Sequence, residues 1–318
     1  MIINNTEINQ SPDAPAWFHA AVTTPRSSKM VQVGGTRIHY QMWDTNPTFP
    51  KPGLLLIHGH AAHSHWWDFI APRFMDRYRV VAMDTSGSGE SDHRSVYQMR
   101  DFSDEVLAVI RHAELRHSTI VGHSFGGAIG RVAAFIDGQR PDPVIAGLIC
   151  VDTSISRTTR SANRDHSRNN VRGRTRDPEI KPVKQRFYRD LDEGARRFRL
   201  RPPQPCANGY LLDYIARYSL RKTEKGYCFK LDQRLFEKMP GGEALPPPVD
   251  MLTALTCPVG YVYGELSRFF AKAEQLSLLA ELIPPERAHR IPGAYHHVFL
   301  DQPLAFSDAL SSLIEGLA

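Results

Sequence analysis

The strongest constraint in this sequence is a tight turn, Gly122-His123-Ser124-Phe125-Gly126, between a strand-like run and a helix-like segment. Apolar residues 119–121 precede the turn, and residues 127–136 follow it with helical character. A strand-to-helix turn of this kind strains the backbone at its central residue, and the flanking glycines give room for the close approach. The turn would expose Ser124 Oγ at the end of a strand, beside a helix N-terminus that favours negative charge.

The rest of the chain alternates between short apolar runs and helical periodicity. Strand candidates are residues 54–57, 79–83, 119–121, 144–151 and 259–262, with a shorter one at 289–291. These runs are rich in aliphatic residues rather than alternating, as expected for strands that are covered on both faces. Residues 30–40 are typical of a hairpin with a Gly34-Gly35 turn, and residues 101–114 of a helix. The pattern predicts an α/β fold, with a mostly parallel sheet and an N-terminal antiparallel hairpin.

The alternation stops after Ser154, where the charge balance also changes. Residues 155–250 hold 22 Lys and Arg against 12 Asp and Glu, whereas the rest of the chain holds 17 against 22. Residues 210–220 in this basic stretch are typical of one amphipathic helix. We therefore expect an N-terminal extension at 1–28, an α/β core at 29–154 and 251–318, and a basic helical cap at 155–250, inserted after strand six.

Composition excludes several other classes of protein. Apolar residues make up 42% of the 318 residues and charged residues 23%, which is typical of a packed globular protein. No apolar run approaches the roughly 20 residues of a membrane span, and the polar first 13 residues predict no secretory signal. The four cysteines form no CxxC pattern, which favours reduced thiols and a cytoplasmic location. The basic stretch lacks interleaved aromatic residues, so we expect no nucleic-acid partner.

A serine hydroxyl is a weak nucleophile until a base removes its proton. Two histidines, His296 and His297, follow the last strand candidate and are the candidates for that base. The chain order of serine, acid and histidine is the order that this type of strand-to-helix turn uses.

Several further motifs follow one another in the order found in one superfamily. They are His58-Gly59 after a buried strand, residues 84–91 (Asp-Thr-Ser-Gly-Ser-Gly-Glu-Ser), the serine turn with Gly127, and His296 followed by Asp301-Gln302-Pro303. Together they resemble the α/β-hydrolase superfamily over about residues 30–154 and 256–318. The nearest branch is the capped one that contains esterases, epoxide hydrolases, haloalkane dehalogenases and C–C hydrolases. In that family the catalytic histidine stands seven residues before the final proline, which implies His296 rather than His297.

The resemblance also implies an oxyanion hole. Its donors would be the backbone N–H of Phe125 and that of His60, with Ala61 as the alternative to His60. A single donor of this kind is worth about 3 kcal/mol of barrier. Four histidines lie on one loop, at positions 58, 60, 63 and 65, without a carboxylate or cysteine partner, so we expect no metal and no cofactor.

The catalytic acid is the open question of the sequence. Many relatives have an aspartate where this chain has Ser267, and a neutral serine cannot stabilise an imidazolium as a carboxylate does. Asp152, at the end of the sixth strand, stands where certain haloalkane dehalogenases keep their acid, and Glu265 is the alternative. We favour Asp152 because the carboxylate must reach the far nitrogen of the histidine. A Ser–His dyad without an acid is the third alternative.

A serine nucleophile suits acyl transfer, whereas dehalogenation and epoxide opening in this family need an aspartate. We expect a serine hydrolase of a small to medium carboxylic ester or a related acyl compound. The alternatives are a C–C hydrolase of a carboxylate-bearing ring-cleavage product and, in another class, a non-catalytic ligand receptor. The basic cap would suit an anionic small-molecule substrate through Arg160 and Arg164, unless that stretch is a solvated flap. Trp66 would line the pocket or pack in the core.

Overall fold

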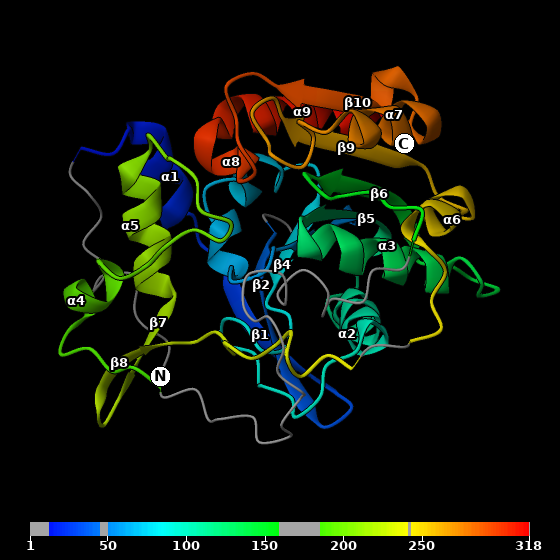
Figure 1. Ribbon diagram of the computed structural model, residues 1–318. Coiled ribbons are helices and arrows are strands. Elements are labelled where there is room, and N and C mark those ends of the chain that lie inside the picture. Colours follow the sequence, from blue (N-terminus) through cyan, green and yellow to red (C-terminus); the bar gives the residue numbers. More distant parts are fainter. Residues whose placement is uncertain (1–12, 45–49, 159–184, 241–242, 318) are drawn as a thin grey trace, which may run out of the picture.

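The computed structural model describes residues 13–44, 50–158, 185–240 and 243–317. Within them an eight-stranded sheet has the strand order β1-β2-β4-β3-β5-β6-β9-β10 (Figure 1). Its strands are β1 (Ser27–Val33), β2 (Thr36–Trp43), β3 (Pro52–Ile57), β4 (Arg79–Met83), β5 (Arg116–His123), β6 (Ile145–Val151), β9 (Val259–Gly264) and β10 (Ala288–Ile291). The mostly parallel α/β sheet predicted from the sequence is confirmed.

The N-terminal hairpin provides the antiparallel part of this sheet. β1 pairs antiparallel with β2, which in turn pairs antiparallel with β4, and the other neighbouring strands are parallel. The two residues of the turn, Gly34 and Gly35, have φ values of 55° and 78°. A two-residue turn with both φ angles positive matches the twist of the strands, and glycine adopts it without steric cost.

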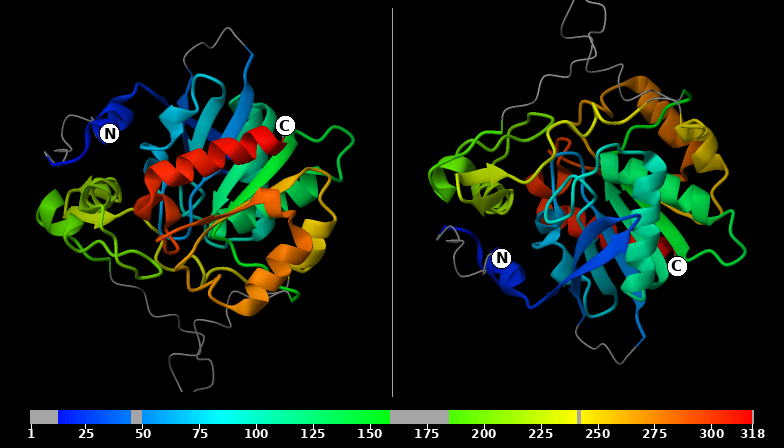
Figure 2. Two further views of the ribbon diagram at one scale, coloured as in Figure 1. Left: turned by 90° about the horizontal axis from the view of Figure 1, so that it is seen from above. Right: turned by 90° about the horizontal axis from the view of Figure 1, so that it is seen from below.

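Helices cover both faces of the sheet, and successive strand residues point to opposite faces. Leu55 and Ile57 pack on the face covered by α2 (Met99–His112), α3 (Phe125–Asp137) and α7 (Ala273–Leu282). Leu54 and Leu56 pack on the face covered by α8 (Val298–Asp301), α9 (Pro303–Leu317) and the short helices η2 (Ser64–Trp67) and η3 (Ala71–Arg73). Figure 2 shows α9 lying across the strands. This double cover explains why the central strands are rich in aliphatic residues.

The segment between β6 and β9 lies outside the sheet and is not purely helical. It contains α4 (Leu191–Ala195), α5 (Gly209–Tyr218), a hairpin of β7 (Leu220–Thr223) and β8 (Gly226–Phe229), and α6 (Pro248–Thr253). The helix predicted at 210–220 corresponds to α5, whereas the hairpin was not predicted. The helix α1 (Ala16–Thr23) lies beside α5, where the Phe18 ring contacts Tyr210 and Tyr214 with centroids 5.0 and 5.4 Å apart (Figure 1).

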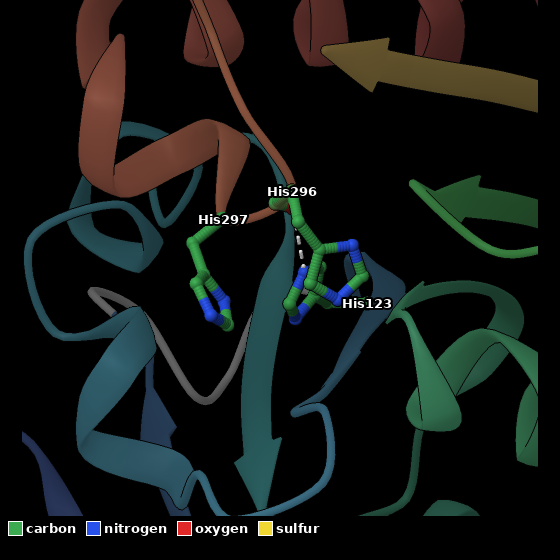
Figure 3. Close-up of side chains that lie close together, drawn as sticks. All are labelled: His123, His296 and His297. Atoms are coloured by element: carbon green, nitrogen blue, oxygen red, sulfur yellow. Dashed lines mark hydrogen bonds between the residues drawn. The ribbon is translucent and has the colours of Figure 1, made fainter. Parts of the chain in front are cut away.

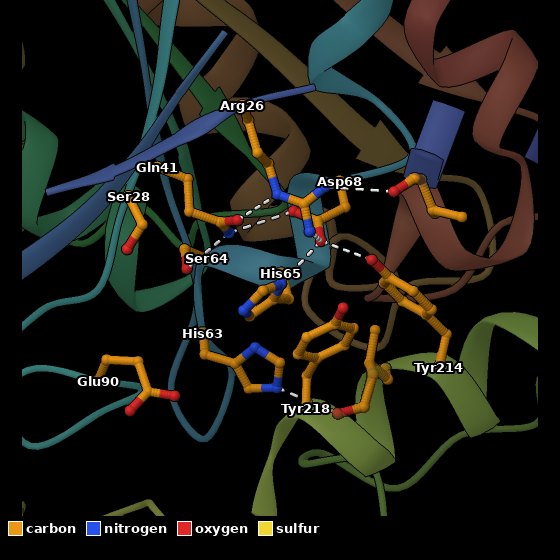
Figure 4. Close-up of polar contacts among 12 residues, drawn as sticks. Arg26, Ser28, Gln41, His63, Ser64, His65, Asp68, Glu90, Tyr214 and Tyr218 are labelled. Carbon is orange, nitrogen blue, oxygen red and sulfur yellow. Dashed lines mark hydrogen bonds and ion pairs between the residues drawn. The ribbon is translucent and has the colours of Figure 1, made fainter. Parts of the chain in front are cut away.

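A buried polar network joins α5 to the core. Asp68 accepts hydrogen bonds from Arg26 at 2.9 Å, from Tyr214 at 2.6 Å and from His65 at 2.7 Å (Figure 4). Burial alone would raise the pKa of Asp68, but the Arg26 and His65 charges and the hydrogen bonds bring that pKa below its usual value. The network therefore ties the N-terminal part of the chain, the loop after β3 and α5 together around one carboxylate.

Among the helices in the described part of the chain, none is both long and apolar enough to cross a membrane.

Candidate active site

Ser124 stands at the turn between β5 and α3 in a strained backbone conformation. Its φ and ψ angles are 52° and −112°, a region that non-glycine residues rarely adopt. Its N–H donates to Val151 O at 2.8 Å, which ties the turn to β6. A Cβ atom at Gly122 would lie 2.4 Å from Gly126 O, and one at Gly126 would lie 2.4 Å from His58 O. Both glycines of the turn are therefore required by close backbone contacts.

His296 lies in the loop between β10 and α8, and its ring is held by a carboxylate from β6. Its Nδ1 is 2.8 Å from Oδ1 of Asp152, which directly follows the last residue of that strand. The exposed fraction is 3% for His296 and 1% for Asp152. A carboxylate accepts, so Nδ1 donates the hydrogen bond, and in the neutral form of the ring this tautomer leaves the lone pair on Nε2. Of the two carboxylates considered from the sequence, Asp152 is the one that contacts His296.

The other hydrogen bonds to Asp152 come from uncharged donors. Ser267 Oγ donates to Oδ1 at 2.6 Å, and the Gly264 N–H donates to Oδ2 at 2.9 Å. Within the described residues no lysine or arginine forms an ion pair with this carboxylate. Ser267 occupies the position at which many relatives have their acid. The structure therefore shows that this serine supports the carboxylate from β6, a role that the sequence analysis did not recognise.

Glu265, the alternative acid, is engaged elsewhere. Its Oε2 accepts the Gly293 N–H at 3.0 Å, and its Oε1 lies 3.5 Å from Arg290 on β10. The exposed fraction of its side chain is 35%, against 0% for Asp152. Glu265 thus stabilises the turn that precedes His296 and makes no hydrogen bond to the His296 ring.

Two further histidines surround His296 (Figure 3). His123 Nε2 donates to His296 O at 3.0 Å, which links the serine turn to the histidine loop. Burial is the main cause that lowers the pKa of His123 well below its usual value and the pKa of His297 to about 3, and the neighbouring His296 lowers both further. Both rings are therefore neutral at physiological pH.

The three rings also form the one candidate metal-ligating group of three or more side chains in the described residues. The ligand atoms of His123, His296 and His297 lie within 4.8 Å of one another. Nδ1 of His296 and Nε2 of His123 are already hydrogen-bonded to protein oxygens. The loop histidines considered from the sequence have other partners: His63 hydrogen-bonds to Ser219, and His65 hydrogen-bonds to Asp68.

The side chains of Phe125 and His60, whose backbone N–H groups are the expected oxyanion donors, pack against an aromatic ring from the segment between β6 and β9. Phe125 begins α3, where the first backbone N–H groups of a helix have no partner within the helix. The Phe236 ring packs against His60, with centroids 4.3 Å apart, and against Phe125 at 5.3 Å. The Phe269 ring packs against the His296 ring, with centroids 4.8 Å apart. The sequence analysis missed both Phe236 and Phe269. Nothing near Phe236 in the sequence marks it as a neighbour of the turn, whereas Phe269 lies two residues after Ser267, the position at which the resemblance leads one to expect the acid.

The remaining expected binding residues have different positions. Trp66 is 2% exposed, and its ring packs against His297 and Phe299 at 5.3 and 6.2 Å. These contacts belong to the hydrophobic core, and contact of Trp66 with substrate stays a prediction. Arg160 and Arg164 lie outside the described residues.

Comparison with known proteins identifies the family. Residues 52–303 match the family model of the alpha/beta hydrolase fold. That match spans most of the chain, and the chain belongs to this family.

Named relatives agree with this assignment. The chain is 25% identical over 269 residues to 2-(acetamidomethylene)succinate hydrolase from Mesorhizobium japonicum, which covers 83% of this chain and 88% of the relative. It is 27% identical over 306 residues to monoacylglycerol lipase from Mycolicibacterium smegmatis, which covers 90% and 95%. The crystal structure of E-2-(acetamidomethylene)succinate hydrolase superposes with a TM-score of 0.72 at 21% identity, over 92% of this chain and 100% of that one. The protein is a hydrolase, and the family implies a small-molecule substrate.

Proposed function

We propose that the protein is a serine hydrolase that cleaves a small to medium carboxylic ester or a related acyl compound through an acyl-enzyme. The observation that carries the proposal is the buried contact between Asp152 and His296, in a chain that also holds Ser124 at a strained strand-to-helix turn. In this proposal residues 29–154 and 251–318 form the catalytic core, and residues 155–250 form the cap.

The proposed reaction has two halves. Ser124 Oγ attacks the substrate carbonyl carbon while His296 Nε2 takes the hydroxyl proton. The tetrahedral oxyanion accepts hydrogen bonds from the N–H groups of Phe125 and His60, and the alcohol leaves with the proton from His296. A water molecule then gives a proton to His296 and attacks the acyl carbon. As the bond from that carbon to Ser124 Oγ breaks, His296 returns the proton to Oγ and the acid is released. Asp152 stabilises the imidazolium that forms in each half.

The surroundings of Asp152 support this role. Among the described residues, its side-chain oxygens contact the imidazole ring and the neutral Ser267 and Gly264 donors, and no lysine or arginine. A carboxylate without a guanidinium or ammonium partner keeps its electrostatic effect for the imidazolium. The names of the two relatives, a hydrolase of a succinate derivative and a monoacylglycerol lipase, support acyl substrates.

A panel of p-nitrophenyl esters from acetate to dodecanoate tests the proposal, with an aromatic dienoic acid as the C–C hydrolysis substrate. We expect release of p-nitrophenol from the shorter esters by the wild-type protein and none above background from Ser124→Ala. Cleavage of the dienoic acid alone would move the assignment to C–C hydrolysis. Equal rates of ester hydrolysis for the wild-type protein and Ser124→Ala would contradict the proposed serine hydrolase.

A further inference from the structure

A recess lies beside the proposed oxyanion loop and has a volume of about 140 Å³. Its walls come from Ala61 and Ala62, which directly follow His60, from the chain after α4, and from the chain after β8. A cavity of about 150 Å³ holds one benzene molecule, so this recess has room for a small polar group. We call it the basic pocket, because of the side chains described next.

Three arginines of one short segment line the basic pocket. They are Arg197, Arg199 and Arg201, which alternate with Phe198 and Leu200. The two apolar side chains are half-buried and buried, whereas the three arginines are exposed. The Phe198 ring reaches the core at Trp66, with centroids 6.4 Å apart. This alternation anchors the segment on one side and places three arginines in the wall of one cavity. Nη1 of Arg199 donates to Arg196 O at 2.8 Å and to Phe198 O at 2.6 Å, which leaves the positive charge of that guanidinium without a counter-charge.

The charges of the basic pocket are not balanced within the described residues. None of the three arginines forms an ion pair with a described carboxylate, and the described residues of the wall include no aspartate or glutamate. Lys230 also lines the pocket, but its buried Nζ donates to Tyr218 O at 2.7 Å and pairs with Glu90 at 2.5 Å. Burial is the main cause that lowers the pKa of His63 in the same wall, so that ring is neutral. A net positive cavity therefore remains.

We propose that the basic pocket binds an anionic oxygen group, a carboxylate or a phosphate, of the substrate. This inference rests on the proposed hydrolase function and names its substrate class: acyl compounds that carry a second, ionised acid group. A substrate whose carbonyl oxygen lies at the His60 and Phe125 N–H groups extends past Ala61 into the pocket. Guanidinium groups recognise carboxylate and phosphate in bidentate fashion, and a cavity lined by one sign of charge concentrates anions. The amide of Gln233, in the same wall, adds a neutral donor.

Two esters of matched shape test the selectivity. Monomethyl succinate ends in a carboxylate, and methyl isocaproate ends in an isopropyl group of similar size. We expect kcat/KM, measured by pH-stat titration, to favour the hemiester by about tenfold or more. In the triple variant Arg197→Gln, Arg199→Gln, Arg201→Gln, this ratio should fall by about 10- to 100-fold, the loss expected when hydrogen bonds to a charged group are removed. Because the ratio compares two substrates of one preparation, partial misfolding cancels.

Arg196→Gln is the matched control, since Arg196 is exposed on the same segment but does not line the pocket. The ratio should stay within about twofold of the wild-type value in that variant. A wild-type protein that cleaves both esters equally, or a triple variant that keeps the wild-type ratio, would overturn the proposal.

Binding separates this inference from the proposed reaction. Calorimetric titration of the full-length wild-type protein and the triple variant with succinate and with inorganic phosphate needs no turnover. We expect binding to the wild-type protein that is at least tenfold weaker in the triple variant. Tighter binding of succinate assigns the pocket to carboxylates, and tighter binding of phosphate assigns it to phosphoryl groups. If neither anion binds, the pocket proposal fails, whereas an absence of turnover with intact anion binding would reject the hydrolase reaction alone.

Discussion

The core and the region under α5 each contain a buried aspartate bound to a histidine ring, and the two pairs have nearly the same geometry. Asp152 lies 2.8 Å from His296 Nδ1, and Asp68 lies 2.7 Å from His65 Nδ1. All four side chains are largely buried. The distance from carboxylate to ring and the burial of the two side chains therefore do not distinguish a pair proposed to be catalytic from a structural one.

The other partners of each carboxylate do separate them. Asp68 shares its charge with Arg26, and the ring of His65 stacks on Tyr218 with centroids 3.7 Å apart. Asp152 has no such cation within the described residues. Because Arg26 neutralises Asp68, we infer that the pair under α5 holds the structure together. In the core pair, His296 is the only ionisable side chain among the described residues that binds the Asp152 carboxylate. Asp152 follows the end of β6, and His296 lies in the loop after β10, beside the serine turn.

The largest expected effect comes from the groups that exchange the proton. Ser124→Ala and His296→Ala should each lower kcat by about 10⁶, the loss seen when a nucleophile or its base is removed from such a unit. The double variant should lose little more than either single one. Circular dichroism would verify that the fold is retained. An inactive His297→Ala beside an active His296→Ala would reject the assignment of the base.

Asp152→Asn should lower kcat by about 10⁴, because the neutral amide keeps the shape but no longer stabilises the imidazolium. Glu265→Gln is the matched control, and its effect on kcat should be about tenfold or less. Steady-state kinetics on one ester measures both variants. A large loss at Glu265 with a small one at Asp152 would move the acid to the end of β9, and small losses at both would indicate a dyad.

The pair under α5 should respond in the opposite way. Asp68→Asn leaves the buried Arg26 without its counter-charge, which should lower the free energy of unfolding by about 3–5 kcal/mol. The kcat of the folded fraction should change by only a few-fold. Urea unfolding and kinetics on the same preparation measure the two quantities. A loss of kcat as large as that of Asp152→Asn, at unchanged stability, would remove the distinction between the pairs.

A smaller effect is expected from the neutral ring beside His296. The pKa of His297 is about 3 in the folded protein, against about 6.5 for a free histidine, so the unfolded chain binds an additional proton between these values. The contribution of His297 to stability is complete above pH 6.5 and is lost as the pH falls toward 3, by about 1.4 kcal/mol per pH unit. In His297→Gln the slope of unfolding free energy against pH should be shallower by that amount. Parallel slopes for the two proteins would refute this expectation.

The sequence predicted the parts of the molecule that depend on local pattern. The predicted bounds of β4 were correct because the apolar run ends at Met83. The turn at Gly34-Gly35 was predictable because a two-residue hairpin turn needs positive φ angles, which both glycines adopt. Asp152 could be preferred over Glu265 because reach to the histidine depends on which strand carries the carboxylate.

The remaining features depend on contacts between distant segments. Ser267 looked like a lost acid, because a sequence does not show that its hydroxyl reaches Asp152. Arg160 and Arg164 were the arginines predicted to bind an anionic substrate, whereas those at 197–201 line a cavity beside the oxyanion loop. Their alternate spacing with Phe198 and Leu200 was the available signal. No comparable signal marks Phe236, which contacts Phe125 only after the chain folds back.

The rate at which a fluorophosphonate probe modifies Ser124 tests whether Asp152, and not Asp68, supports a catalytic histidine. The probe reports activation of the serine and does not depend on the identity of the substrate. Peptide mass spectrometry locates the label, and wild-type protein, Asp152→Asn and Asp68→Asn are compared under conditions in which all three are folded. We predict labelling at Ser124, at a rate that falls at least 100-fold in Asp152→Asn and stays within a few-fold of wild type in Asp68→Asn. An unlabelled wild-type protein, or equal rates in the two aspartate variants, would contradict the account.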